Sequence, residues 1–218
     1  WNFRGQLLWT PSDRMEVRLI TDAEEIDEVC CGVANLIDGP TGGVVRLLGG
    51  DLVSDDPFAY GNYLDFDPRN EIETQGTSLH IDYDFSNFTL TSITAFRTLD
   101  QFQSGDVDFT SARLILPEAG DFRNTEIETF TQEIRLASNG DGPLQWVAGA
   151  FYFNEEVVQD ETFGLGPDFR SYIDVLLAAA GAPGALGGVE AALGLPAGAI
   201  YATGTGNQSE RYTLDDET

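Results

Sequence analysis

The connections between successive strand-like segments alternate between very short and very long, and this alternation constrains the fold of the chain most strongly. Residues 129–156 show the repeating unit, in which two segments of period-two sequence flank the polar turn SNGDGP at 138–143. Gly, Asn, Asp and Pro are typical of the turn between two antiparallel strands. Similar units, with turns near 11–14 and 85–87, predict three hairpins at about 2–24, 77–98 and 127–157.

Three long segments, at about 25–73, 99–125 and 158–210, separate or follow these hairpins. Such loops are unusual in a compact soluble domain, although short helices at 172–180 and 188–193 would break up the third. They are normal in outer-membrane β-barrels, which have short periplasmic turns and long extracellular loops. The predicted fold class is therefore all-β, an antiparallel up-and-down transmembrane β-barrel segment of about six strands, with the start of a seventh, and long extracellular loops.

Aromatic residues accompany every short turn, and further aromatics recur along the same strand faces. An eight-residue strand spans roughly 26 Å, which a tilt of about 40–45° reduces to about 19–20 Å of height. This is close to the apolar band between the two aromatic girdles of a membrane barrel, although aromatics are also favoured in any strand. The predicted girdle residues are Trp9, Tyr83, Phe88, Phe96, Trp146 and Tyr152.

Charged residues occupy alternate positions of the same predicted strands. If the alternation is right, they face the inside of the barrel and keep it wet and polar. The predicted lumen-lining residues are Glu16, Arg18, Asp82, Arg97, Glu133 and Arg135.

The chain is strongly acidic, with 37 Asp and Glu against 11 basic residues, all of them Arg, and a formal net charge of −26. This charge argues against nucleic acid as a partner and against attachment to anionic lipid through a basic patch. A hydrophobic content of 42% argues against a disordered chain. Acidic loops that keep a β protein soluble are the simplest alternative explanation of the charge.

Nothing in the sequence predicts an enzyme, a cofactor or a metal site. The only histidine, His80, alternates with Ser78 and Asp82 on a strand, where it is better explained as a lumen-facing or solvated side chain. Nothing in the sequence places an apolar pocket beside carboxylate pairs such as Asp106 and Asp108 that would separate their pKa values. They also lack the glycine and closing glutamate of a calcium-binding loop, so a solvated acidic loop is favoured.

The two cysteines, Cys30 and Cys31, are adjacent. Neighbouring Cα atoms lie about 3.8 Å apart, whereas a relaxed disulfide needs about 4.4 Å or more. The sequence leaves open a vicinal bridge, two free thiols or a partner elsewhere. It contains no CxxC pair of the kind that holds zinc.

Several stretches together resemble the β-barrel of TonB-dependent outer-membrane receptors. These stretches are RGQLLWTPSDRMEVRL with the acidic, cysteine-containing loop after it, LTSITAFR with the following GDVDF, TQEIRLAS, and WVAGAFYFNEE. The resemblance covers residues 1 to about 158, and the spacing of these stretches is its most specific part. It identifies residues 1–218 as part of such a barrel, without a plug domain and without the strands that would close it.

The resemblance implies a location in the cell outer membrane and a family-typical barrel of 22 strands filled by a plug. It implies uptake of a scarce nutrient such as a ferric siderophore, driven through the TonB complex, which contacts the plug. The expected partners are therefore outer-membrane lipid, the nutrient and, through a plug absent from this chain, TonB. About six strands cannot close a membrane barrel, so this chain is not expected to transport alone.

The alternative is a secreted or surface all-β module that binds a carbohydrate or another ligand through acidic loops. The two hypotheses differ in what covers the face that carries Phe88, Phe96, Trp146 and Tyr152. Lipid or detergent indicates the barrel, whereas a second sheet indicates a sandwich.

Overall fold

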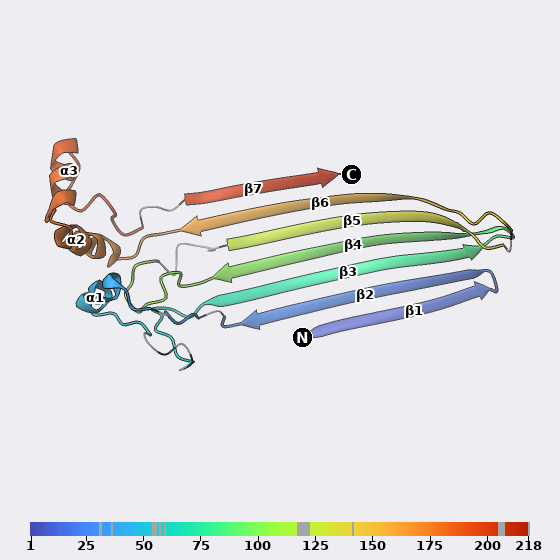
Figure 1. Ribbon diagram of the computed structural model, residues 1–218, viewed down its shortest axis with the longest axis horizontal. Helices are drawn as coiled ribbons and strands as arrows, with labels where there is room; N and C mark the ends of the chain where they lie inside the picture. Colours follow the sequence, from blue (N-terminus) through green and yellow to red (C-terminus); the bar gives the residue numbers. More distant parts are fainter. Residues whose placement is uncertain are drawn as a thin grey trace.

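Seven strands form one antiparallel sheet in which the spatial order follows the order along the chain (Figure 1). The structure is a computed structural model that describes residues 1–30, 32–35, 37–53, 56, 58, 60–116, 123–140, 142–204 and 208–217. The strands are β1 (Asn2–Ser12), β2 (Met15–Glu28), β3 (Arg69–Asp84), β4 (Phe88–Ser104), β5 (Arg123–Ser138), β6 (Val147–Phe163) and β7 (Gln208–Glu217). The predicted all-β antiparallel character is confirmed.

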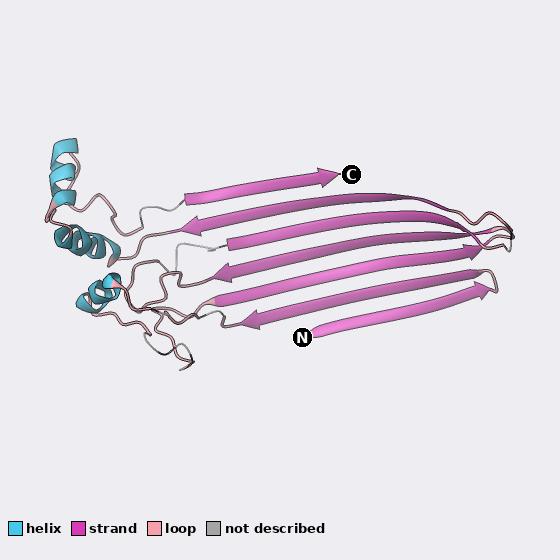
Figure 2. Ribbon diagram, viewed as in Figure 1, coloured by secondary structure: helices cyan, strands magenta, loops and turns pink. Residues whose placement is uncertain are grey.

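Short and long connections lie at opposite ends of the sheet (Figure 1). The short ones, at 13–14, 85–87 and 139–146, close the hairpins β1–β2, β3–β4 and β5–β6. The long ones are the first loop (residues 29–68), the second loop (105–122) and the third loop (164–207). Every helix of the described residues lies at the loop end (Figure 2).

The strands extend further toward the loops than the sequence predicts. β3 begins at Arg69 rather than at about 77, and β6 ends at Phe163 rather than at about 157. Charged and amide side chains occupy both faces of these extensions, so the hydrophobic alternation fades while the backbone ladder continues. The amides connect the strands directly: Gln101 Nε2 donates to Asn70 Oδ1 at 3.0 Å, and Asn70 Nδ2 donates to Glu28 Oε1 at 2.8 Å.

The helices are α1 (Pro40–Leu47), α2 (Phe169–Ala179) and α3 (Ala185–Leu193). The two expected in the third loop are present and begin earlier than predicted. α1 was not predicted, because Gly42 and Gly43 suggest a loop. Pro40 at its first turn has the backbone angle and the missing N–H that suit a helix start.

The buried apolar core of the described residues lies among the loops. It consists of Val45, Leu52, Ala112, Leu114 and Ile115, with Phe163, Phe169 and Tyr172 packed against it. The first, second and third loops all contribute to this core, so they form one packed unit, which we call the loop cluster. A bridge between Ile115 and Leu165 joins the second and third loops.

The sheet itself has no such core. Large apolar side chains on its strands are open to solvent, with 63% of Leu7, 59% of Trp9, 47% of Phe96 and 47% of Ile134 exposed. Because apolar surface of this extent is unfavourable in water, the exposure indicates a face that another medium or molecule covers.

Both edges of the sheet are open. Within the described residues β1 pairs only with β2, and β7 pairs only with β6. Among the described residues, β7 pairs with Asn154–Phe163 of β6. The sheet is therefore an open one.

Candidate functional site

The register of the sheet places all six predicted lumen-lining charges on one face, which we call the polar face. Residues directly opposite each other in antiparallel strands project to the same side. One cross-strand row contains Glu16, Asp82, Thr91 and Arg135. The neighbouring row contains Arg18, His80, Ile93 and Glu133, and a third contains Asp22, Gly76 and Arg97.

Charges of both signs are paired along the strands of this face. Arg18 contacts Glu16 at 2.9 Å, and Arg135 approaches Glu133 at 3.5 Å. His80 Nε2 lies 3.0 Å from a carboxylate oxygen of Asp82. These pairs are partly exposed, so each contributes little to stability, although together they make the face polar.

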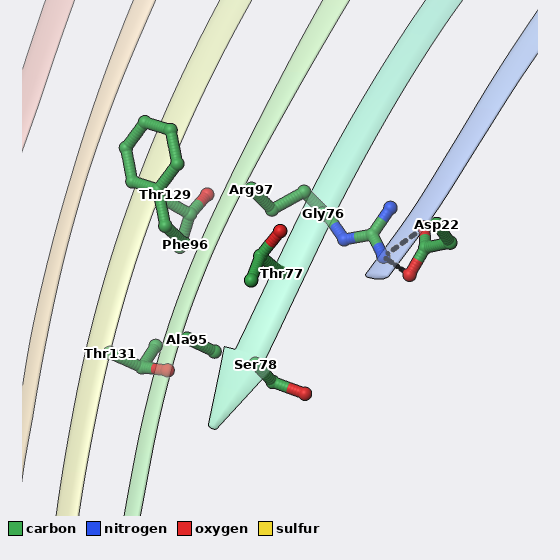
Figure 3. Close-up of a pocket in the computed structure, with 9 residues that line it drawn as sticks. All are labelled: Asp22, Gly76, Thr77, Ser78, Ala95, Phe96, Arg97, Thr129 and Thr131. Carbon is green, nitrogen blue, oxygen red and sulfur yellow. Dashed lines mark hydrogen bonds and ion pairs between the residues drawn. The ribbon is translucent and has the colours of Figure 1, made fainter. Parts of the chain in front are cut away.

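One ion pair of this face connects two strands that are not neighbours (Figure 3). The Arg97 guanidinium on β4 reaches over Gly76 on β3 and donates to both carboxylate oxygens of Asp22 on β2, at 2.9 and 2.7 Å. A Cβ atom at Gly76 would lie only 2.6 Å from a guanidinium nitrogen. The glycine therefore makes room for the arginine. Sequence reasoning identified Arg97 but missed Asp22 and Gly76, which only the register brings together.

An open hollow of about 250 Å³ adjoins this ion pair (Figure 3). Small or hydroxyl side chains line it on the polar face, namely Ser78, Ala95, Thr129 and Thr131. Thr77 and Phe96 border it as well, although their register positions belong to the opposite face. Hydroxyls beside a guanidinium and a carboxylate can exchange hydrogen bonds with a polar molecule that passes along this face.

The opposite face, which we call the apolar face, carries all six predicted girdle aromatics. They are Trp9, Tyr83, Phe88, Phe96, Trp146 and Tyr152. Near the turns the rings form a chain: Phe85 lies 4.6 Å from Tyr83 and 4.5 Å from Phe88, and Phe88 lies 6.4 Å from Trp146. Aliphatic residues such as Leu90 and Ile134 follow along the strands.

A second row of aromatics ends the apolar band. Phe96 and Phe130 are directly opposite each other, and the Phe130 ring lies 6.1 Å from that of Tyr152. Beyond it, toward the loops, four carboxylates occupy one row across four strands: Glu25, Glu73, Asp100 and Glu126. All four are exposed. Like charges placed opposite one another repel, so this part of the face suits an aqueous or ionic environment.

Among the described residues of the loop cluster, two carboxyls have a pKa raised well above its usual value. Burial, reinforced by the neighbouring Asp106, raises the pKa of Asp65 to about 6. Burial also raises the pKa of Asp108 to about 7, against the opposing effect of hydrogen bonds from Thr110. The solvated loop that the sequence favours for Asp106 and Asp108 is wrong, because Asp106 is only 2% exposed. Nor does the sequence bring Asp65 to this pair.

An arginine organises the third loop. Arg170 on α2 pairs with Asp174 at 3.0 Å and with Glu190 on α3 at 2.5 Å. Glu190 is only 2% exposed and also accepts hydrogen bonds from the backbone N–H groups of Gly198 and Ile200. The hydrogen bond from Arg170 has the largest effect, and together with the two backbone bonds it lowers the pKa of Glu190 to about 2. These residues hold the segments of the third loop together.

In the part of the chain that the structure describes, no three His, Cys, Asp or Glu side chains are arranged to hold a metal ion. Over the same residues, no helix is long and apolar enough to span a membrane. Cys30 is disulfide-bonded, whereas Cys31 lies outside the described residues.

Comparisons with protein-family models, curated proteins and solved structures found no match to this chain. The geometry of the sheet and of the loop cluster is therefore the basis for the function proposed below.

Proposed function

We propose that this chain forms part of the wall of an outer-membrane β-barrel receptor of the TonB-dependent kind, which takes up a scarce nutrient such as a ferric siderophore. One observation carries the proposal. The sheet has an apolar face bounded by aromatic rings and a polar face lined by ion pairs, and no second layer of the described residues covers either. Membrane barrels alternate apolar residues outward and polar residues inward in this way.

The dimensions of the apolar band support a membrane location. On β4 the band runs from Phe88 beside the turn to Phe96, and the acidic row begins at Asp100. Eight residues of strand at a barrel tilt correspond to about 19–20 Å of height, close to the apolar band of outer-membrane barrels. The carboxylate row beyond Phe96 would then lie outside the hydrocarbon region.

The polar face would line the interior. Some of its charges are paired within the wall, as in Arg97 with Asp22, and charged side chains of this kind favour contact with water. The hollow beside this pair supplies hydroxyl groups along the path of a polar nutrient.

The two ends of the sheet suit the two sides of an outer membrane. The short turns with their aromatic chain fit the periplasmic side, and the loop cluster fits the extracellular side. Since the three loops share a packed core, they would present a defined surface for ligand capture.

The open edges of the sheet support the proposal that this chain forms only part of a barrel wall. An unpaired strand edge in lipid leaves backbone groups without hydrogen bonds, at a cost of several kcal/mol each. Seven strands with two open edges therefore need further strands before they can transport. Coupling to TonB would come from a plug domain, and no part of the described sheet or loop cluster forms one.

The alternative of a soluble binding module requires a second sheet against the aromatic face. Among the described residues the helices and the buried core lie at the loop end instead (Figure 2). No observation specifically favours a sandwich.

Expression of the chain without detergent, followed by gel filtration and circular dichroism, tests the proposal. We expect insoluble protein that becomes β-rich in micelles or vesicles. In vesicles with brominated acyl chains, fluorescence of Trp9 and Trp146 should be quenched, because both rings belong to the apolar face. A detergent-free soluble monomer with a cooperative thermal transition would contradict the membrane assignment.

A further inference from the structure

Three carboxyl groups meet where the first loop touches the second. Asp106 is 2% exposed, and its two carboxylate oxygens accept backbone hydrogen bonds from different loops. The N–H of Asp65 donates to Oδ2 at 3.3 Å, and the N–H of Asp108 donates to Oδ1 at 3.1 Å. Asp106 therefore joins the two loops and brings the side chains of Asp65 and Asp108 close to its own.

One oxygen on each flanking side chain has no hydrogen-bond partner among the described residues. These atoms, Oδ1 of Asp65 and Oδ2 of Asp108, are both buried. The other oxygen of Asp108 accepts from the backbone and hydroxyl of Thr110. A buried carboxylate oxygen without a hydrogen-bond partner is energetically unfavourable when the group is ionised. Protonation of the carboxylate removes this unfavourable free energy.

No described cation bonds to the three carboxyls. Arg113 exerts an attraction on Asp65, but its guanidinium is held by Asp168 through two hydrogen bonds of 3.1 Å. On the other side, Asp108 shares a small cavity with Tyr172 and with Asp38, which is paired with Arg46 at 2.6 Å. Arginines nearby are thus already committed to other carboxylates.

We propose that protons on Asp65 and Asp108 fasten the first loop to the second, and that loss of these protons as the pH rises through neutrality releases the fastening. In the protonated state each carboxyl can share a hydrogen bond with Asp106. In the ionised state three adjacent negative charges repel one another. The raised pKa values of Asp65 and Asp108, about 6 and about 7, put this change between mildly acidic and mildly alkaline conditions. Separation of the two loops would also open the loop surface that captures the ligand. This consequence rests on the proposed function.

Hydrogen exchange of the backbone amides of Asp65 and Asp108, measured on the full chain in micelles, tests the proposal. After correction for intrinsic rates, we expect protection to fall by about tenfold or more between pH 5 and pH 8. The amides of Gly198 and Ile200, which bond to Glu190, should stay protected at both values and report that the loop cluster is folded.

The double variant Asp65→Asn, Asp108→Asn should lose this pH dependence. The matched control Asp67→Asn should keep it, because Asp67 is exposed and outside the contact. If the double variant does not fold, carboxyl ¹³C titration of the unmodified chain decides the question. Midpoints near 6 and 7 support the proposal, and midpoints below 5 overturn it.

Two further results would overturn the proposal. One is equal protection of both amides at pH 5 and pH 8. The other is full recovery of protection at pH 8 when Ca²⁺ alone is added, since the cluster would then work as a cation site rather than through protons.

Discussion

Gly76 shows how one missing side chain shapes the polar face. Asp22 and Arg97 lie on strands that are not neighbours, and they meet only because nothing projects from the strand between them. Gly149 on β6 is crowded in a different way, since a Cβ there would lie 2.8 Å from the carbonyl oxygen of Ile134. The two glycines therefore tolerate a methyl group differently.

Alanine at these two positions gives a matched pair of variants. In Gly76→Ala the obstacle is the flexible end of Arg97, which can move, and the lost ion pair is exposed. We expect a loss of less than about 1 kcal/mol. In Gly149→Ala the obstacle is backbone, so the loss should exceed that of Gly76→Ala. Urea unfolding in micelles measures both, and the reverse order would show that the Arg97 bridge matters more than the backbone contact.

Glu190 is the single residue on which the third loop depends most. Its carboxylate accepts from Arg170, Gly198 and Ile200 at once. Glu190→Ala should therefore increase proteolysis within 185–204 while leaving the sheet's circular dichroism unchanged. Asp174→Ala, which removes only the exposed partner of Arg170, is the control and should have a smaller effect. Equal cleavage in the two variants would argue against a central role for Glu190.

At the scale of the strand, Ile134 of β5 and Phe151 of β6 lie on opposite faces of the sheet. Ile134 belongs to the middle of the apolar band, and Phe151 lies across from Glu133 on the polar face. The two positions have similar heights along the sheet and are both well exposed. They differ mainly in the face that they occupy.

Arginine at these two positions tests the faces directly. Ile134→Arg should reduce the stability of the membrane-inserted sheet by about 2–4 kcal/mol, the cost of a cationic side chain near the bilayer midplane. Phe151→Arg should cost much less, because its guanidinium would face water and Glu133. Folding into vesicles at graded urea concentrations measures the difference. Similar costs in the two variants would contradict the assignment of the faces.

The hairpins and the two faces could be predicted because their determinants are local. Turn residues fix where each hairpin reverses, and period-two alternation assigns the girdle and lumen residues to opposite faces. The acidic extensions could not be predicted, since Glu71 and Glu73 pair in β3 through their backbone and not through apolar side chains. α1 could not be predicted either, because Gly42 and Gly43 make its sequence resemble a loop although Val44 and Val45 are buried.

The clusters of charged residues depend on contacts between distant parts of the chain. Asp22 and Arg97 are separated by 75 residues, and Asp65 and Asp106 by 41. No local spacing encodes such pairs. Only the register and the packing of the loops bring them together, so the sequence could propose Arg97 as a lumen residue but could not name its partner.

For the molecule as a whole, the loop cluster should be most stable between about pH 4 and pH 5. The pKa of Glu190 is lowered to about 2, so its contribution is complete above about 4.5 and is lost as the pH falls toward 2. The pKa values of Asp65 and Asp108 are raised, so the folded state binds more protons, and stability declines as the pH rises from about 4 toward 6 and 7. Thermal unfolding monitored by proteolysis of the loops across pH 2–9 measures this profile, and a maximum above pH 7 would contradict it.

The alternation of short turns and long loops along the chain determines which strand pairs form first during folding. Ser12 pairs with Met15 across the first turn, whereas the same Met15 pairs with Tyr83 on its other side only after the whole first loop has closed. Contacts near in sequence form faster than distant ones, because less chain entropy is lost. Each hairpin is therefore an early folding unit, and the joining of hairpins is the slower step. During that interval the unpaired edges of the hairpins are open to other chains, so the rate at which the loops collapse onto their shared core decides between a completed sheet and an aggregate.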